Sequence, residues 1–131
     1  MNEEAVRLLD AMERLESRLN SYWNFYTLVV LAAVGWLMSA AKPFSLNQSI
    51  AVTVALGLFF LANLSVIRAA TRRLLAFEQE MQAIAPTLEL RSPALRRDLT
   101  GRAMPGRMLL SYGLHMAVDA AVIYAVWSKL A

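Results

Sequence analysis

Three long runs that almost lack charge constrain this chain more than any other feature of its sequence. They cover residues 22–41, 49–67 and 108–127; the first two contain no Asp, Glu, Lys, Arg or His, and the third contains only His115 and Asp119. A helix needs roughly 20 apolar residues to cross a hydrocarbon core of about 30 Å. With 58% hydrophobic residues in a chain of 131, the sequence predicts a single-domain, all-α integral membrane protein with three transmembrane helices.

The distribution of basic residues predicts how these spans are oriented. Every arginine lies before the first span or between the second and the third, whereas the two lysines, Lys42 and Lys129, lie on the other side. Cytoplasmic segments of membrane proteins carry an excess of basic residues. We therefore expect a protein of the plasma (inner) membrane with its N-terminus in the cytoplasm and its C-terminus outside.

Two apolar stripes at heptad spacing run across the predicted membrane surface. The first stripe consists of Ala5, Leu8, Met12, Leu15, Leu19, Tyr22 and Tyr26. The second stripe consists of Ile67, Ala70, Leu74, Phe77, Met81 and Ile84. A stripe that repeats every 3.5 residues packs against another helix. We therefore expect the first two helices to form a long antiparallel hairpin that extends into the cytoplasm as a coiled coil, through residues 1–21 and 68–84.

Local signals predict where these two helices begin and end. The first is expected from Glu3 to about residue 41, ended by Pro43. An outer turn at residues 42–48 contains Ser45 and Gln48, which have the spacing of a capping box. At 1.5 Å per residue each helix is roughly 58 Å long, so about 25 to 30 Å should protrude from the membrane.

Charged pairs one turn apart support the cytoplasmic half of the first helix. Glu3 precedes Arg7 by four residues, and Asp10 precedes Arg14 by the same spacing. An acid placed four residues before a base is the favourable order on a helix surface. We therefore expect two exposed ion pairs at these positions.

Residues 85–107 form a connector rich in Pro and Arg. Ser92 as N-cap and Pro93 at the first helical position predict a short helix, whose Leu95 and Leu99 are expected to face the membrane surface. Its arginines are expected to bind anionic lipid headgroups or an acidic partner; they are Arg91, Arg96, Arg97 and Arg102. Binding of nucleic acid is not favoured, because no aromatic residue lies among these arginines.

The third span carries the strongest candidates for a functional site. Asp119 lies near its middle, where a carboxyl group is costly unless it is paired, solvated or protonated. Ser111, His115 and Asp119 follow one another at steps of four, so they share one face of the helix. One interpretation is a polar path or ion site, formed as a ring in a homo-oligomer. The other is a polar clamp that joins this span to the hairpin or to a neighbouring subunit.

Two asparagines and a group of aromatic residues mark the cytoplasmic ends of the first two spans. Asn24 and Asn63 should lie at similar depth in an antiparallel hairpin. Asn63 extends the second stripe by one step, where a polar residue fixes the register of a helix pair, or lines a polar constriction. Tyr22 and Tyr26, with Trp23 between them, are typical of anchors at the membrane surface.

The composition excludes several kinds of chemistry. The chain has no Cys and a single His, so disulfides, thiolate sites and a two-histidine metal site within one chain are excluded. It has no glycine-rich phosphate loop and no common nucleophile motif. We expect no enzyme activity, no cofactor and no metal.

Two functions remain open from the sequence. The first is a small homo-oligomeric ion channel or pore, for cations or protons, with Asp119 and His115 along its polar path. The alternative is a non-conducting membrane anchor or interaction subunit, whose cytoplasmic hairpin docks a partner protein. Membrane lipids are expected partners of either.

Overall fold

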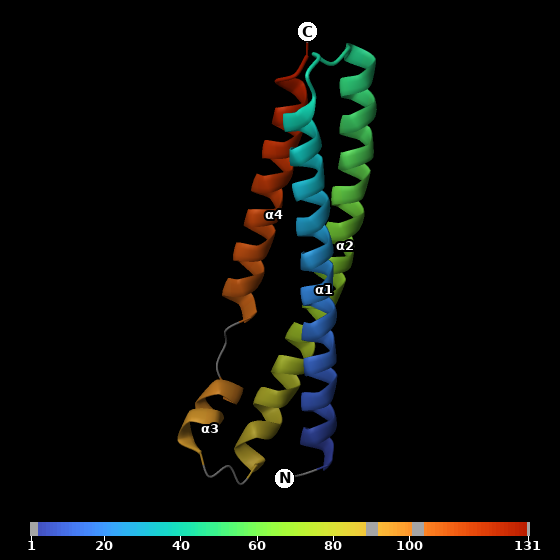
Figure 1. Cartoon of the computed structure of the whole chain (residues 1–131). Coiled ribbons are helices and arrows are strands. Elements are labelled where there is room, and N and C mark those ends of the chain that lie inside the picture. The colour runs from blue at the N-terminus through green and yellow to red at the C-terminus, as the bar shows by residue number, and fades with distance from the viewer. Residues whose placement is uncertain (1–2, 89–91, 101–103, 131) are drawn as a thin grey trace.

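The fold is built from long helices that lie nearly side by side. The computed structural model describes residues 3–88, 92–100 and 104–130. Within these residues the α-helices are α1 (Glu3–Ser39), α2 (Leu46–Ile84), α3 (Pro93–Thr100) and α4 (Met104–Trp127), and a short 3₁₀ helix (Ala85–Thr87) follows α2. α1, α2 and α4 are each long and apolar enough to cross a membrane, and α1 packs antiparallel to α2 (Figure 1). The three predicted helices of membrane-spanning length and the antiparallel packing of the first two are thus confirmed.

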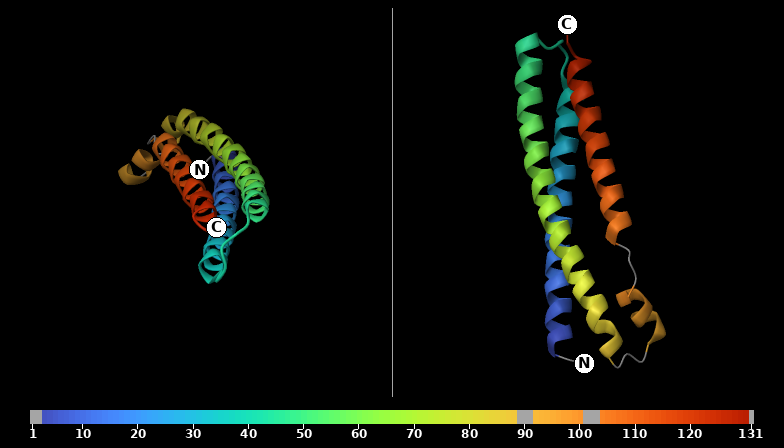
Figure 2. Two further views of the ribbon diagram at one scale, coloured as in Figure 1. Left: turned by 90° about the horizontal axis from the view of Figure 1, so that it is seen from above. Right: turned by 180° about the vertical axis from the view of Figure 1, so that it is seen from behind.

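The molecule has two parts that differ in the number of helices. α4 lies beside the upper portion of the hairpin, and α3 lies near the lower end of α2 (Figure 1). We call residues 25–66 and 104–130 the three-helix part, and residues 3–24 and 67–88 the two-helix part. The start of α1 and the end of α4 lie at opposite ends of this elongated molecule (Figure 2).

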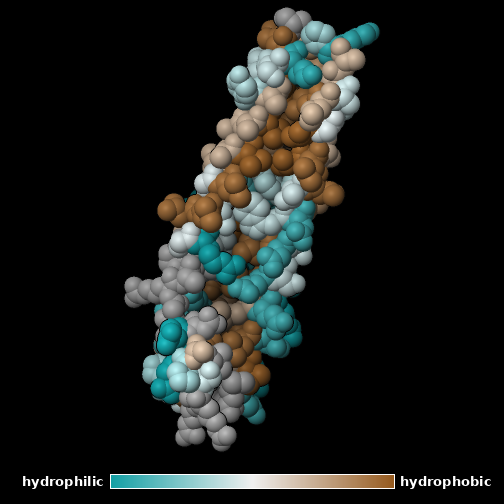
Figure 3. Space-filling view, turned by 60° about the vertical axis from the view of Figure 1, so that its left-hand side comes forward, coloured by the Kyte–Doolittle hydropathy of each residue, from teal (hydrophilic) through white to brown (hydrophobic). Residues whose placement is uncertain are grey.

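Large apolar side chains are exposed in one of these parts. They extend on α1 from Phe25 to Met38, on α2 from Leu46 to Val66 and on α4 from Leu109 to Trp127; we call this surface the apolar belt. Among the described residues of the two-helix part, Val6 is the only large apolar residue that is exposed. Figure 3 shows apolar residues gathered over the upper portion of one face and hydrophilic residues mostly below them. Soluble proteins rarely expose so much contiguous apolar surface, so the belt indicates an integral membrane protein.

The stripes are the faces along which α1 and α2 meet. All residues of the first stripe are buried or half-buried, as are all residues of the second. At the end of the two-helix part, Ala5, Met81 and Leu88 form a small buried cluster. The spacing of the sequence therefore predicts the packed faces correctly on both sides of the membrane surface.

The covered face of α2 also continues upward through the three-helix part. Ser49, Phe60 and Asn63 are buried, and Thr53 and Leu56 between them are half-buried. Together with the second stripe these residues keep alternating steps of three and four along the whole of α2. Apolar spacing alone predicts this pattern only from Asn63 onward, because Ser49 and Thr53 are not apolar.

The outer turn and the end of α4 close the three-helix part together. The backbone N–H of Ser45 donates to Gln48 Oε1 at 2.9 Å, and the N–H of Gln48 donates to Ser45 Oγ at 3.3 Å, so the predicted capping box is present. The N–H of Phe44 donates to the carbonyl of Lys129 at 2.7 Å. Phe44 itself is buried in a core with Val126 of α4. The turn thereby holds all three spans in register at this end.

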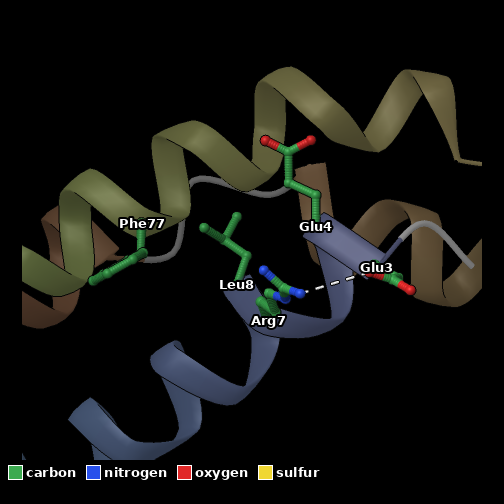
Figure 4. Close-up of a pocket in the computed structure, with 5 residues that line it drawn as sticks. All are labelled: Glu3, Glu4, Arg7, Leu8 and Phe77. Atoms are coloured by element: carbon green, nitrogen blue, oxygen red, sulfur yellow. Dashed lines mark ion pairs between the residues drawn. The ribbon is translucent and has the colours of Figure 1, made fainter.

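Exposed charges lie along the two-helix part. The predicted ion pairs are present, with 3.6 Å between Arg7 and Glu3 and 3.3 Å between Arg14 and Asp10. Both pairs are largely exposed, so each contributes little to stability. At the end of the hairpin a cavity of about 600 Å³ lies between the helices; Leu8 and Phe77 border it beside the Glu3–Arg7 pair (Figure 4).

Candidate functional site

The site is a cluster of polar side chains inside the three-helix part. α1 supplies Tyr26, α2 supplies Asn63, and α4 supplies His115 and Asp119. Tyr26 is the last residue of the first stripe and Asn63 lies on the covered face of α2, so both side chains point inward. His115 and Asp119 are one helical turn apart, which places them on the same face of α4. We call these four residues the polar cluster.

Short hydrogen bonds join all three helices through Asp119 and His115. The Tyr26 hydroxyl donates to Asp119 Oδ1 at 2.8 Å. Asp119 Oδ2 lies 2.7 Å from His115 Nδ1, and His115 Nε2 lies 3.3 Å from Asn63 Nδ2. Each carboxylate oxygen of Asp119 thus has a protein partner, one from α1 and one from its own helix.

The hydrogen bonds assign a role to each nitrogen of His115. One proton is shared between Nδ1 and Asp119 Oδ2 across their 2.7 Å hydrogen bond. The amide nitrogen of Asn63 only donates, so Nε2 accepts. These roles fit an imidazole that carries no proton on Nε2.

Aromatic rings close around the imidazole. Tyr26 stacks on His115 with ring centroids 4.1 Å apart and planes 24° apart. Trp23 and Phe60 meet the imidazole edge-on, at 5.8 and 6.4 Å. His115 is 0% exposed, and the side chain of Asp119 is 14% exposed. The imidazole is therefore fully enclosed, whereas a small part of the Asp119 side chain stays exposed.

The remaining polar candidates of the sequence lie outside this cluster. Ser111 is half-buried one turn before His115, where it borders a separate cavity with Asn20 and Arg107. Asn24 is exposed on α1. Of the two asparagines expected at similar depth, the described hydrogen bonds thus join only Asn63 to the cluster.

Tyr26 is the member of the cluster whose role sequence reasoning missed. It was expected to be an anchor at the membrane surface, and this is wrong: Tyr26 is 3% exposed and its hydroxyl is bonded to Asp119. The signal was present, because Tyr26 belongs to the first stripe, and a buried phenol usually finds a hydrogen-bond partner. Trp23, also expected to be an anchor, is half-buried against Tyr26, with ring centroids 5.6 Å apart.

Two of the four connector arginines lie among the described residues. Arg96 and Arg97 are exposed on α3, while Arg91 and Arg102 lie outside the described residues. Leu99 packs against the cluster at the end of the hairpin. It was expected to face the membrane surface, but the open end of the hairpin offers apolar protein surface instead. Binding of headgroups by Arg96 and Arg97 stays a prediction.

The polar cluster offers hydrogen bonds between helices and a proton shared by His115 and Asp119. Within the part of the chain that the structure describes, no three His, Cys, Asp or Glu side chains gather where they could hold a metal ion. The hydroxyl of Tyr26, whose ring stacks on His115, already donates to Asp119. The hydrogen bonds of the cluster connect α4 with both α1 and α2.

Comparison of the chain with protein-family models, with curated proteins and with solved structures gave no match.

Proposed function

We propose that the protein is a non-conducting membrane anchor whose cytoplasmic hairpin docks a partner protein. The observation that carries this proposal is the internal pairing of the polar cluster. Asp119 and His115 were the residues that made an ion path attractive, and their polar atoms bond to Tyr26, Asn63 and each other within one chain.

The surroundings of the cluster also favour a role in holding the helices together over a role in ion conduction. An ion path needs polar groups that face water and can replace the hydration shell of the ion. Here the imidazole lies between the rings of Trp23, Tyr26 and Phe60. Interhelical hydrogen bonds in a membrane contribute about 0.6 to 2 kcal/mol each, which suits a clamp.

The length of the hairpin supports a docking function. The apolar belt ends at Phe25 on α1 and at Val66 on α2, while the helices continue to Glu3 and Ile84. At 1.5 Å per residue the helices extend about 27 to 33 Å beyond the belt. In the orientation predicted from the arginines, this two-helix part stands in the cytoplasm as a coiled coil with charged outer faces.

A flux experiment tests the absence of conduction. Purified protein is reconstituted into vesicles that contain a pH-sensitive dye, under a proton or potassium gradient, with gramicidin as the positive control. We expect wild type and Asp119→Asn to leak no faster than vesicles without protein. A flux in wild type that Asp119→Asn removes would contradict the proposal and restore the channel.

Site-directed photocrosslinking in cells tests the docking surface. A photoreactive residue is placed at Glu13 or Glu80, both exposed on the two-helix part, and at Leu61 in the belt as the control. We expect one protein adduct of the same mass at both hairpin positions and none at Leu61. An adduct of twice the chain mass would instead support the homo-oligomer, which stays a prediction.

A further inference from the structure

A third cavity lies where α4 begins to pack on α2. Its volume is about 420 Å³. Two arginines and four apolar or aromatic residues line it: Leu64, Arg68, Arg72, Leu75, Met108 and Tyr112. It shares no residue with the polar cluster, and the proposed docking function does not use it.

The cavity lies across the cytoplasmic edge of the apolar belt. The belt ends at Val66 on α2 and at Leu109 on α4. Leu64 therefore lies on the belt side of this edge, whereas Arg68 and Arg72 lie beyond it, about one and two turns from Leu64. A molecule that fills the cavity meets apolar side chains on one side of the edge and positive charge on the other.

The charges in this cavity lack an acidic partner. Arg7, Arg14 and Arg107 each lie within ion-pair distance of a carboxylate, but among the described residues Arg68 and Arg72 do not. They are four residues apart on α2, so their side chains emerge on the same face. Two guanidinium groups at this spacing suit the oxygens of a phosphate group.

Tyr112 adds an independent indication of a ligand. It lines the same cavity, and its hydroxyl is buried with no hydrogen-bond partner in the part of the chain that the structure describes. A buried donor without an acceptor is destabilising, and such groups are uncommon in folded proteins. Because the hydroxyl itself is closed off from the cavity, an acceptor oxygen held there would pair with it once the Tyr112 ring turns toward the cavity.

We propose that this cavity binds one anionic phospholipid of the cytoplasmic leaflet. Its phosphate lies between Arg68 and Arg72, with an oxygen in reach of the Tyr112 hydroxyl. The adjoining part of one acyl chain lies along Leu64 and Met108. A lipid is favoured over a soluble phosphate compound because Leu64 continues the cavity into the belt. The proposal rests on the orientation with arginines in the cytoplasm, but not on the docking of a partner.

Lipid binding to the full chain in mild detergent tests the proposal, with native mass spectrometry as the readout. The probes are dioleoylphosphatidylglycerol and dioleoylphosphatidylcholine. The variants are Arg68→Gln and Arg72→Gln, and the matched control is Arg73→Gln. Arg73 is an exposed arginine next to Arg72 that does not line the cavity. Each of these three substitutions removes one positive charge from α2 at a similar distance from the edge of the belt.

We expect wild type to retain one phosphatidylglycerol in preference to phosphatidylcholine. Arg68→Gln and Arg72→Gln should each weaken this binding about tenfold, the effect of losing a charged hydrogen bond, and Arg73→Gln about twofold or less. Tyr112→Phe, which keeps the ring, should weaken it a few-fold. Each variant is first shown to keep the circular dichroism spectrum and elution volume of wild type.

Two results would overturn the site. The first is equal retention of both lipids by wild type. The second is an equal loss for Arg72→Gln and Arg73→Gln, which would assign the binding to the general attraction of a basic segment for anionic headgroups. Neither result depends on flux or crosslinking, so this proposal and the proposed function can fail separately.

Discussion

The two parts of the molecule are built on the same helix pair but with opposite distributions of polarity. The two-helix part has charged residues outside and the apolar stripes inside. The three-helix part has the apolar belt outside and the polar cluster inside. In water, burial of apolar surface drives two helices together. Between lipids that driving force is absent, so close packing and hydrogen bonds have to hold the helices.

The largest effect should come from truncating an apolar residue in the two-helix part. Leu74 is 1% exposed, so Leu74→Ala should destabilise this part by about 3 kcal/mol through lost burial and the cavity left behind. Hydrogen exchange measured by peptide resolves the two parts. Protection should fall in residues 3–24 and 67–88 and persist in the spans.

Leu61→Ala is the matched control for that change. Leu61 is 68% exposed on the belt of the same helix, so its truncation should change stability by less than about 0.5 kcal/mol. If both substitutions had equal effects, the division between a water-facing and a lipid-facing part would be wrong.

The second effect in size should come from removing the carboxylate of the polar cluster. Asp119→Leu leaves the Tyr26 hydroxyl and His115 Nδ1 without their acceptor, which should destabilise the three-helix part by about 2 kcal/mol. Asp119→Asn keeps one acceptor oxygen and should have about half this effect. In both variants, hydrogen exchange should increase in the spans, while the two-helix part keeps its protection. A more stable Asp119→Leu variant would show that the cluster does not hold the helices.

The sequence predicted well those features that depend on neighbouring residues. The spans follow from run length, the packed faces from heptad spacing, and the Ser45 cap from residues three apart. The polar cluster could not be predicted from neighbouring residues, because Tyr26 and Asp119 are far apart in the chain. No local pattern shows which helix α4 faces. The upper part of the covered face of α2 could not be predicted either. It contains Ser49 and Thr53, and a heptad stripe is recognised by its apolar residues.

A smaller effect should come from removing a single hydroxyl in the three-helix part. Tyr26→Phe keeps the ring that stacks on His115 but removes the donor to Asp119. We therefore expect the stability of the three-helix part to fall by about 0.6 to 1 kcal/mol. Tyr124→Phe is the control, because Tyr124 is exposed on the belt. Stability is read from unfolding of α4 in mixed micelles. In the double variant Tyr26→Phe/Asp119→Leu the two losses should not add, because they remove the same bond.

The smallest effect should appear at the border between the two parts. Arg107, near the start of α4, lies 3.7 Å from Glu16 of α1, and both side chains are largely exposed. Glu16→Gln should therefore reduce stability by only about 0.3 kcal/mol, and the difference should vanish at high salt because exposed charges are screened. Glu13→Gln, an exposed acid of the same helix, is the control. A loss above about 1 kcal/mol that persists at high salt would mean that α4 is held by this ion pair as much as by the polar cluster. The contrast between a charged exterior of little energetic weight and a polar interior that holds the spans would then fail.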